Sequence, residues 1–179
     1  MPNGRALLNT SIADIKRIFS VPLRVVETGS IRSYTEKSRS TLKIVQLLTP
    51  KDTLVSVEIN EKHINIAKDV CKDYANITFV NEDSHKYLEG LSEMNGGPYH
   101  FHLAYLDSVN NADHIFKEFC LVVPTIWEHG LVIVDDYGRG VKCDRVIRFL
   151  NEHKHSYHIQ GQQIRTVVTK SLQDKVRAL

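Results

Sequence analysis

The chain has 179 residues, 42% of them hydrophobic and 25% charged, a composition typical of one globular domain with a proper core. Its net charge of +2 gives no reason to expect a nucleic-acid partner, and no apolar run reaches the length that would cross a membrane. The first residues lack a signal-peptide core, so we expect a cytoplasmic protein. From the chain length, we expect residues 1–179 to form a single domain.

The first predicted element is a short leading helix within residues 1–20. Its apolar residues Ile12, Ile15 and Phe19 recur at helical spacing and therefore share one side. Pro22 ends the helix, because proline cannot continue the hydrogen-bond ladder.

A strand, a glycine turn and a helix are predicted for residues 23–48. The strand is a short apolar, β-branched run that ends at Glu27. Gly29 follows where a chain that turns sharply needs a positive φ or a close approach to a ligand. Helical spacing of apolar residues resumes behind hydroxyl side chains that can cap a helix near residues 38–40. A turn of this kind presents free backbone N–H groups to a ligand.

Further along the chain, short apolar runs that fit strands alternate with stretches of helical periodicity. This alternation predicts an α/β fold, a Rossmann-like doubly wound sheet of about seven mostly parallel strands, the last one antiparallel, with helices on both faces. Residues 170–179 are expected to form a loose tail. Strands are expected at residues 53–59, 77–80, 101–107, 131–136, 157–160 and 164–169, helices at residues 61–74, 85–91, 112–123 and 140–152, and turns at residues 94–98 and 161–162.

The three cysteines lie far apart, at Cys71, Cys120 and Cys143, without any C-x-x-C spacing. This distribution favours reduced, structural thiols over disulfides or a zinc site.

Acidic residues stand at the carboxyl ends of five successive predicted strands. In open α/β sheets ligands bind at that edge, so the set as a whole points to a binding site. A carboxylate after the second strand can accept hydrogen bonds from both hydroxyls of a ribose, each contributing about 1.5 to 3 kcal/mol when well formed. The acids are Glu27, Glu58, Asp83, Asp107, and Asp135 with Asp136.

Several nucleotide-binding folds place a carboxylate after the second strand, and the number of glycines in the first turn distinguishes them. A dinucleotide site or a P-loop needs several glycines in the first turn, and here Gly29 is followed by a long polar connection over residues 30–39. Glu27-Thr28-Gly29, an acid-x-glycine pattern at the end of a first strand, resembles motif I of the class I S-adenosylmethionine (SAM)-dependent methyltransferases. The chain departs from that motif in having Ile31, Arg32 and Ser33 where further glycines are usual.

The resemblance extends from about residue 23 to residue 150 and is more specific over residues 106–137. That segment is similar to small bacterial and phage-type methyltransferases, with an LDS strand end, an EF pair in the next helix and a DD pair after the fifth strand. The glycine-glycine turn that usually precedes the last pair reads Glu128, His129, Gly130 here.

The resemblance implies SAM as cofactor and in-line methyl transfer to a small-molecule acceptor, with a hydroxyl as the expected nucleophile. In class I methyltransferases the acid after the third strand contacts the adenine amino group, a place that Asp83 and Ser84 occupy. Asp107 and Asp136 are the implied catalytic residues. The implied cofactor-binding residues are Glu27, Thr28, Gly29, Ser30, Glu58, Ile59, Asp83, Ser84 and Asp107.

Two acids after one strand and one after its neighbour also suggest a metal. Hard cations such as Mg²⁺ prefer carboxylate oxygens. By similarity to catechol-type O-methyltransferases, Asp107, Asp135 and Asp136 are candidate ligands, with Asn110 or Asn111 as helpers. The alternative is that Asp107 touches the methionine end of the cofactor while Asp136 caps the following turn.

The sequence alone leaves the base, the function and the assembly undecided. Asp107, Asp136, His114 and Lys142 are all candidates for the base. Lys142 also belongs to a basic group with Arg139, Arg145 and Arg148, which could serve an acidic substrate or RNA but is more typical of a solvated helix face. A catalytically inactive SAM-binding module and an NAD-dependent oxidoreductase are the alternative functions. A homodimer is one option for the assembly, and neither nucleic acid nor a membrane is expected as a partner.

Overall fold

The computed structural model describes residues 6–35, 40–93 and 101–179. Within these ranges, seven strands form one sheet in the order β3-β2-β1-β4-β5-β7-β6, and only β7 runs against its neighbours β5 and β6. The predicted α/β sheet with an antiparallel last strand is therefore confirmed. The strands are β1 (Arg24–Thr28), β2 (Thr53–Val57), β3 (Ile77–Val80), β4 (Phe101–Leu106), β5 (Ile126–Val134), β6 (Tyr157–Gln160) and β7 (Gln163–Val167).

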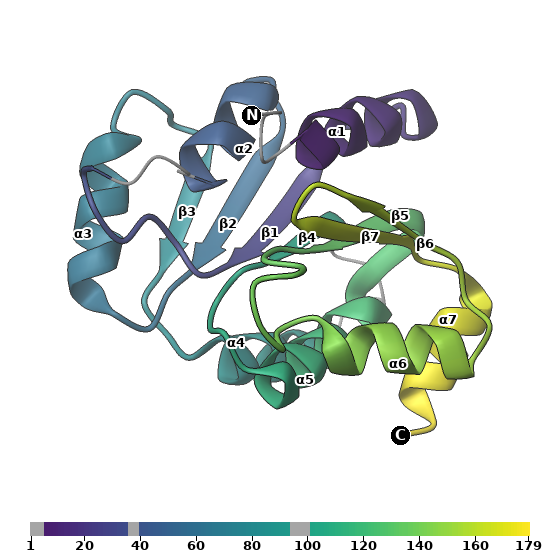
Figure 1. Cartoon of the computed structure of the whole chain (residues 1–179). Helices are drawn as coiled ribbons and strands as arrows, with labels where there is room; N and C mark the ends of the chain where they lie inside the picture. Colours follow the sequence, from purple (N-terminus) through teal and green to yellow (C-terminus); the bar gives the residue numbers. More distant parts are fainter. Residues whose placement is uncertain (1–5, 36–39, 94–100) are drawn as a thin grey trace.

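Helices cover both faces of the sheet (Figure 1). One face carries α1 (Ala6–Ile18), α2 (Ser40–Leu47) and α3 (Glu61–Val70). The other carries α4 (Ser84–Glu93), α5 (Ala112–Val122), α6 (Asp144–Glu152) and α7 (Lys170–Arg177), with a 3₁₀ turn, η1 (Val123–Thr125), after α5. None of the helices in the described ranges is long and apolar enough to cross a bilayer.

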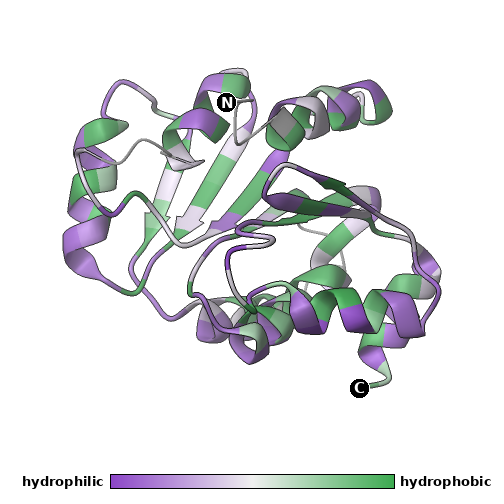
Figure 2. Cartoon of the chain, in the orientation of Figure 1, coloured by the Kyte–Doolittle hydropathy of each residue, from purple (hydrophilic) through white to green (hydrophobic). Residues whose placement is uncertain are grey.

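The central strands are apolar on both sides because each side packs against a helix layer. Val25 joins the core beneath α1 and α2, and its neighbour Val26 joins the core on the α5 side. Every residue of β4 is buried. Figure 2 shows hydrophobic residues along the strands, while the outward sides of the helices are hydrophilic. Alternation along β1 consequently sends its last two side chains, those of Glu27 and Thr28, to opposite layers.

The expectation of a loose tail over residues 170–179 is wrong, because most of this segment is α7. The Thr169 hydroxyl accepts the Leu172 N–H and caps the helix. Leu172 and Val176, four residues apart, are buried in the core, and the Gln173 amide donates to the Ile126 carbonyl at 2.8 Å. Two buried apolar residues and a cap are enough to fix a short helix whose other positions are polar.

Other boundaries also differ from the prediction. α3 ends at Val70, four residues early, and β5 begins at Ile126, five residues early. α6 begins at Asp144, because Gly138 and Gly140 hold the preceding segment in left-handed conformations with φ of 77° and 123°. The predicted turn at residues 94–98 lies outside the described residues.

The cysteines are free thiols, as expected. Burial raises the pKa of the Cys120 thiol to about 11 and that of Cys143 to about 12. The thiolate is the reactive form, so both side chains are suited to packing rather than to chemistry.

Candidate active site

A cavity of about 180 Å³ lies at the carboxyl ends of β1, β2 and β3, where α3 and α4 begin. It lies at the sheet edge that the acidic strand ends indicated, beside the β1–β4 boundary where the strand order reverses. Five of the residues predicted to bind a cofactor line it: Gly29, Glu58, Ile59, Asp83 and Ser84.

Gly29 presses the end of β1 against the end of β4. Its φ is 83°, and a Cβ built on it would lie 2.4 Å from the carbonyl oxygen of Asp107 and 2.9 Å from the Cα of Ser108. Its N–H donates to the carbonyl of Val57, so the turn is tied to β2 as well. The glycine is required both by conformation and by the contact between two strand ends.

Glu58, directly after β2, is held by backbone groups of two loops. One oxygen accepts the Asn60 N–H at 2.8 Å and the other accepts the Ser30 N–H at 3.3 Å. His63 Nδ1 lies 3.6 Å from the second oxygen. Each carboxylate oxygen has two lone pairs, so the fixed carboxylate keeps acceptor capacity for a ligand in the cavity. Predicted Ser30 thus contributes through its backbone.

A buried polar network lies against the cavity on the α5 side. The fully buried carboxylate of Glu118 accepts the Thr28 hydroxyl at 2.9 Å and the Ser84 hydroxyl at 2.5 Å. His114 Nε2 lies 3.3 Å from Glu118, and His85 stacks on the His114 ring with 3.9 Å between centroids. The hydrogen bond to Glu118 raises the pKa of His114 above its ordinary value, although partial burial opposes the rise.

Sequence reasoning placed Thr28 and Ser84 in the site but missed Glu118, which anchors both. The sequence contains a signal that could have identified Glu118. Glu118 lies three residues after Ile115 and directly before Phe119, on the buried stripe of α5, where an unpaired acid is unfavourable.

Asp83 and Glu27 have structural partners of their own. Asp83 accepts the Lys86 N–H at 3.1 Å in the first turn of α4 and still lines the cavity. Glu27 is fully buried on the α2 side, where it accepts the hydroxyls of Thr41 at 2.7 Å and Ser56 at 3.0 Å. It does not line the cavity, so its assignment as a cofactor ligand stays a prediction.

Farther along the same edge, Lys142 joins two of the predicted acids. Its Nζ lies 2.6 Å from Oδ1 of Asp107 and 3.3 Å from Oδ2 of Asp136. The Lys142 side chain is 1% exposed, that of Asp107 17% and that of Asp136 33%. Burial raises the pKa of the Asp107 carboxyl above its ordinary value, and the Lys142 ammonium opposes that rise. The Arg32 guanidinium donates hydrogen bonds to the carbonyls of Asp107 and Ser108, and it thereby links the loop after β1 to the loop after β4.

The arrangement does not fit the predicted magnesium site. Within the described ranges, no group of three His, Cys, Asp or Glu side chains could hold a metal ion. Lys142 lies within hydrogen-bond distance of both Asp107 and Asp136, and Asp135, the third expected ligand, is buried. Magnesium therefore stays a prediction without geometric support.

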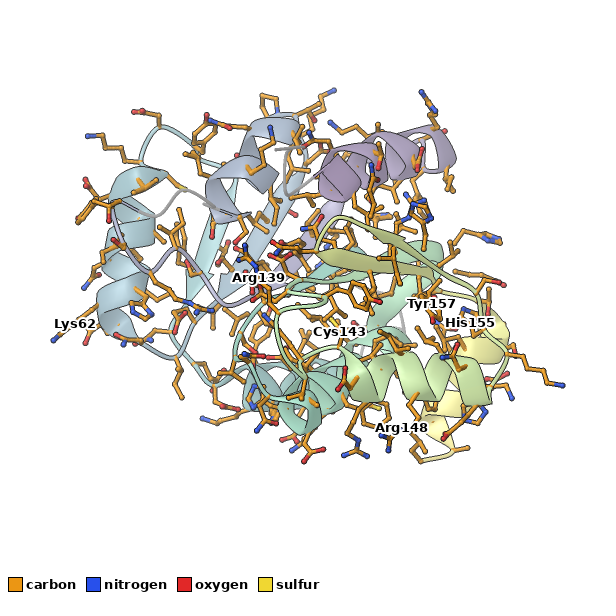
Figure 3. The ribbon with its side chains drawn as sticks, viewed as in Figure 1. Lys62, Arg139, Cys143, Arg148, His155 and Tyr157 are labelled. Carbon is orange, nitrogen blue, oxygen red and sulfur yellow. The ribbon has the colours of Figure 1, made fainter. Side chains whose placement is uncertain are left out.

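The basic group predicted around Lys142 is not one surface. Lys142 points inward, and Arg145 pairs with Asp113 at 2.7 Å. Figure 3 shows Arg139 in the loop after β5 and Arg148 on the outer side of α6, pointing away from the sheet. The described part of the chain therefore presents no continuous basic face here for an RNA backbone.

Comparison with known proteins identifies the fold. No family model and no curated protein sequence matches the chain, but many solved structures do. MycE, a methyltransferase of the mycinamycin biosynthetic pathway crystallised with Mg, SAH and mycinamycin VI, shares 14% identity at a TM-score of 0.64. The alignment covers 89% of this chain and 48% of MycE, so the chain spans about half the length of that relative.

Two further neighbours match over most of both chains. A protein assigned as an O-methyltransferase from Klebsiella pneumoniae has 15% identity and a TM-score of 0.65, covering 92% of this chain and 80% of the neighbour. A protein assigned as an rRNA methylase from Clostridium thermocellum has 13% identity and a TM-score of 0.63, covering 90% and 96%. The three neighbours differ in the acceptor that they are described with and agree in the fold.

Proposed function

We propose that this chain, whose fold is that of the class I SAM-dependent methyltransferases, binds SAM and transfers its methyl group to a hydroxyl of a small molecule. One observation carries the proposal: a carboxylate, that of Glu58, is fixed by backbone N–H groups inside a cavity at the carboxyl ends of β1, β2 and β3. A fixed acceptor at the end of the second strand suits the two hydroxyls of a ribose.

The residues around the cavity fit the parts of this cofactor. Glu58 would accept the ribose hydroxyls, and Asp83 with Ser84 would face the adenine. Gly29, which leaves no room for a side chain, lets the backbone approach the ligand closely. The cavity is smaller than the roughly 300 to 1,000 Å³ of pockets that enclose a drug-sized ligand, so the methionine end would extend along the edge towards Asp107.

When bound, SAM supplies an electrophilic methyl group. The chain's own residues must then align an acceptor with it and ease the loss of the acceptor's proton. Asp136, one third exposed, is the carboxylate of the pair that an acceptor can reach, whereas Asp107 is more enclosed. We therefore assign proton acceptance to Asp136 and ligand positioning to Asp107.

A small-molecule acceptor is favoured over a nucleic acid. The basic residues after β5 are divided between the interior and separate surface positions, so they offer no track for a phosphate backbone. The neighbour MycE was crystallised with a small molecule of its pathway. An NAD-dependent oxidoreductase is not proposed, because β7 interrupts the parallel order that dinucleotide folds use and the first turn has a single glycine.

Calorimetric titration with SAM and with S-adenosylhomocysteine tests the cofactor. We expect both to bind, and Glu58→Gln to weaken binding by about tenfold or more, because a charge-assisted hydrogen bond is worth about 1.5 to 3 kcal/mol. Glu152→Gln, at the far end of α6, is the matched control and should bind as the unmodified protein does. Binding of NAD without any heat from the two SAM compounds would contradict the proposal.

A second candidate, a module that binds SAM without catalysis, is favoured by the bonds from Lys142 to both candidate carboxylates. Methyl-labelled SAM incubated with the protein and cell extract separates the two. Label transferred to any product, and not in a Glu58→Gln control, excludes the binding-only function.

A further inference from the structure

Lys142 lies between Asp107 and Asp136, two of the three acids that were predicted as magnesium ligands. Its ammonium is within hydrogen-bond distance of one carboxylate from the end of β4, Asp107 at 2.6 Å, and one from the end of β5, Asp136 at 3.3 Å. The two strands are parallel neighbours, so a cation between their ends links them.

The loop before α6 fixes this position. Gly140 has a φ of 123° and lies against Asn110, whose amide nitrogen would be 3.1 Å from a Cβ at residue 140. Cys143, the next residue after Lys142, is buried, and its thiol donates to the carbonyl of Asp135 at 3.5 Å. A buried residue on one side and a packed glycine on the other leave the Lys142 side chain directed into the protein.

Burial makes the pairing obligatory. A charge removed from water costs several kcal/mol unless opposite charges and hydrogen bonds compensate it, and Lys142 is 1% exposed. The compensation is mutual, because Asp107 and Asp136 are like charges at one edge and would repel without a cation near them.

A divalent cation competes for the same oxygens. Mg²⁺ binds carboxylate oxygens at about 2.0 to 2.1 Å, and Mn²⁺ uses similar ligands. A metal that bound Asp107 and Asp136 would therefore lie next to the ammonium, where like charges repel strongly. Either the lysine or a metal can neutralise the pair, but not both in this arrangement.

We infer that Lys142 is the built-in cation of this site and that the pair Asp107 and Asp136 consequently binds no divalent metal. Lys142 is a positioning residue, since it holds the two carboxylates and is itself shielded from a substrate. The inference is independent of the proposed function, because it concerns metal binding and holds whichever reaction the edge serves.

Direct metal titration tests it without any assay of activity. Mn²⁺ is the probe, followed by electron paramagnetic resonance of free and bound ion, with Mg²⁺ as competitor. The unmodified protein should show no site-specific binding. Lys142→Met, which keeps an unbranched side chain one atom shorter and removes its charge, should bind Mn²⁺ about tenfold or more tighter than any residual binding by the unmodified protein, and its melting temperature should rise with Mg²⁺.

Lys142→Arg is the matched control, since it keeps a cation and should bind Mn²⁺ no better than the unmodified protein. Equal Mn²⁺ binding by Lys142→Met and Lys142→Arg would overturn the inference. If Lys142→Met does not fold, the unmodified protein still decides. Stoichiometric Mn²⁺ binding that Asp107→Asn or Asp136→Asn abolishes overturns the inference, and the absence of such binding supports it.

Discussion

Gly29 and Gly161 both have a positive φ but differ in what surrounds them. A Cβ at residue 29 would overlap the backbone of Asp107, whereas one at residue 161 would meet nothing within 4 Å. Gly161→Ala should therefore cost only the conformational term, about 1 to 2 kcal/mol. Gly29→Ala adds a clash with rigid backbone and should cost about 2 to 5 kcal/mol in total. Urea unfolding followed by circular dichroism measures both, and equal losses would contradict the packing argument.

The pair His114 and Glu118 predicts a pH dependence of stability. The hydrogen bond to Glu118 raises the pKa of His114, so the protonated ring stabilises the folded protein. This contribution is complete below the ordinary histidine pKa of about 6.5 and is lost as the pH rises through the higher folded-state value. The unfolding free energy of the unmodified protein, minus that of His114→Gln, should therefore decrease as the pH is raised from about 6.5 through the folded-state pKa of His114, and should stay level at higher pH. The exposed His158 supplies the control, and a difference for His158→Gln of the same shape would contradict the assignment.

Single residues show where sequence reasoning succeeds and where it stops. Glu58 and Asp83 were predicted at the binding edge because parallel strands end there, Ser84 was added by resemblance to the methyltransferases, and all three line the cavity. Glu27 was placed there for the same reason, yet its side chain faces α2, because a strand alternates faces and the sequence does not show which face is which. Lys142 was named both as a candidate base and as part of a basic, solvated helix face, since nothing in a helical pattern shows that a loop will turn a lysine inward.

At the scale of elements, local chemistry explains both the correct and the incorrect boundaries. The β6–β7 hairpin was predicted correctly, because Gly161 and Gln162 provide a two-residue turn and Gln160 pairs with Gln163. The start of α6 was misplaced because Gly138 and Gly140 delay it, and α7 was missed because most of its residues are polar.

α7 is expected to contribute to stability in spite of its polar sequence. Leu172 is fully buried in the core on the α5 side. Leu172→Ala should lower the free energy of unfolding by about 2 to 5 kcal/mol, the range for a buried leucine that leaves a cavity. Leu179→Ala, at a side chain that is 74% exposed, is the control and should change little. Thermal or urea unfolding measures both variants, and a Leu172→Ala protein as stable as the control would show that α7 is dispensable.

For the molecule as a whole, the order of the strands decides which of the acidic strand ends meet. The cavity lies at the ends of β1, β2 and β3 and extends to Ser108 and Val109 just after β4, while Lys142 joins Asp107 and Asp136 at the ends of β4 and β5. The sequence could predict a shared edge because successive strands are parallel. It could not predict that the edge separates into a cavity and a lysine-linked pair, because that division depends on loop geometry.

The position of the cavity predicts which backbone amides are protected from hydrogen exchange when a ligand binds. S-adenosylhomocysteine bound in the cavity should slow amide hydrogen exchange at the turn around Gly29, at the start of α3 and at the start of α4, where backbone groups surround Glu58 and Asp83. The β6–β7 hairpin, two strands beyond β4, should exchange at an unchanged rate by local opening. Exchange measured by mass spectrometry with and without the ligand resolves these segments, and Glu58→Gln should weaken the protection at all three together. Protection confined to the opposite edge of the sheet, or spread evenly over the hairpin, would place the ligand elsewhere.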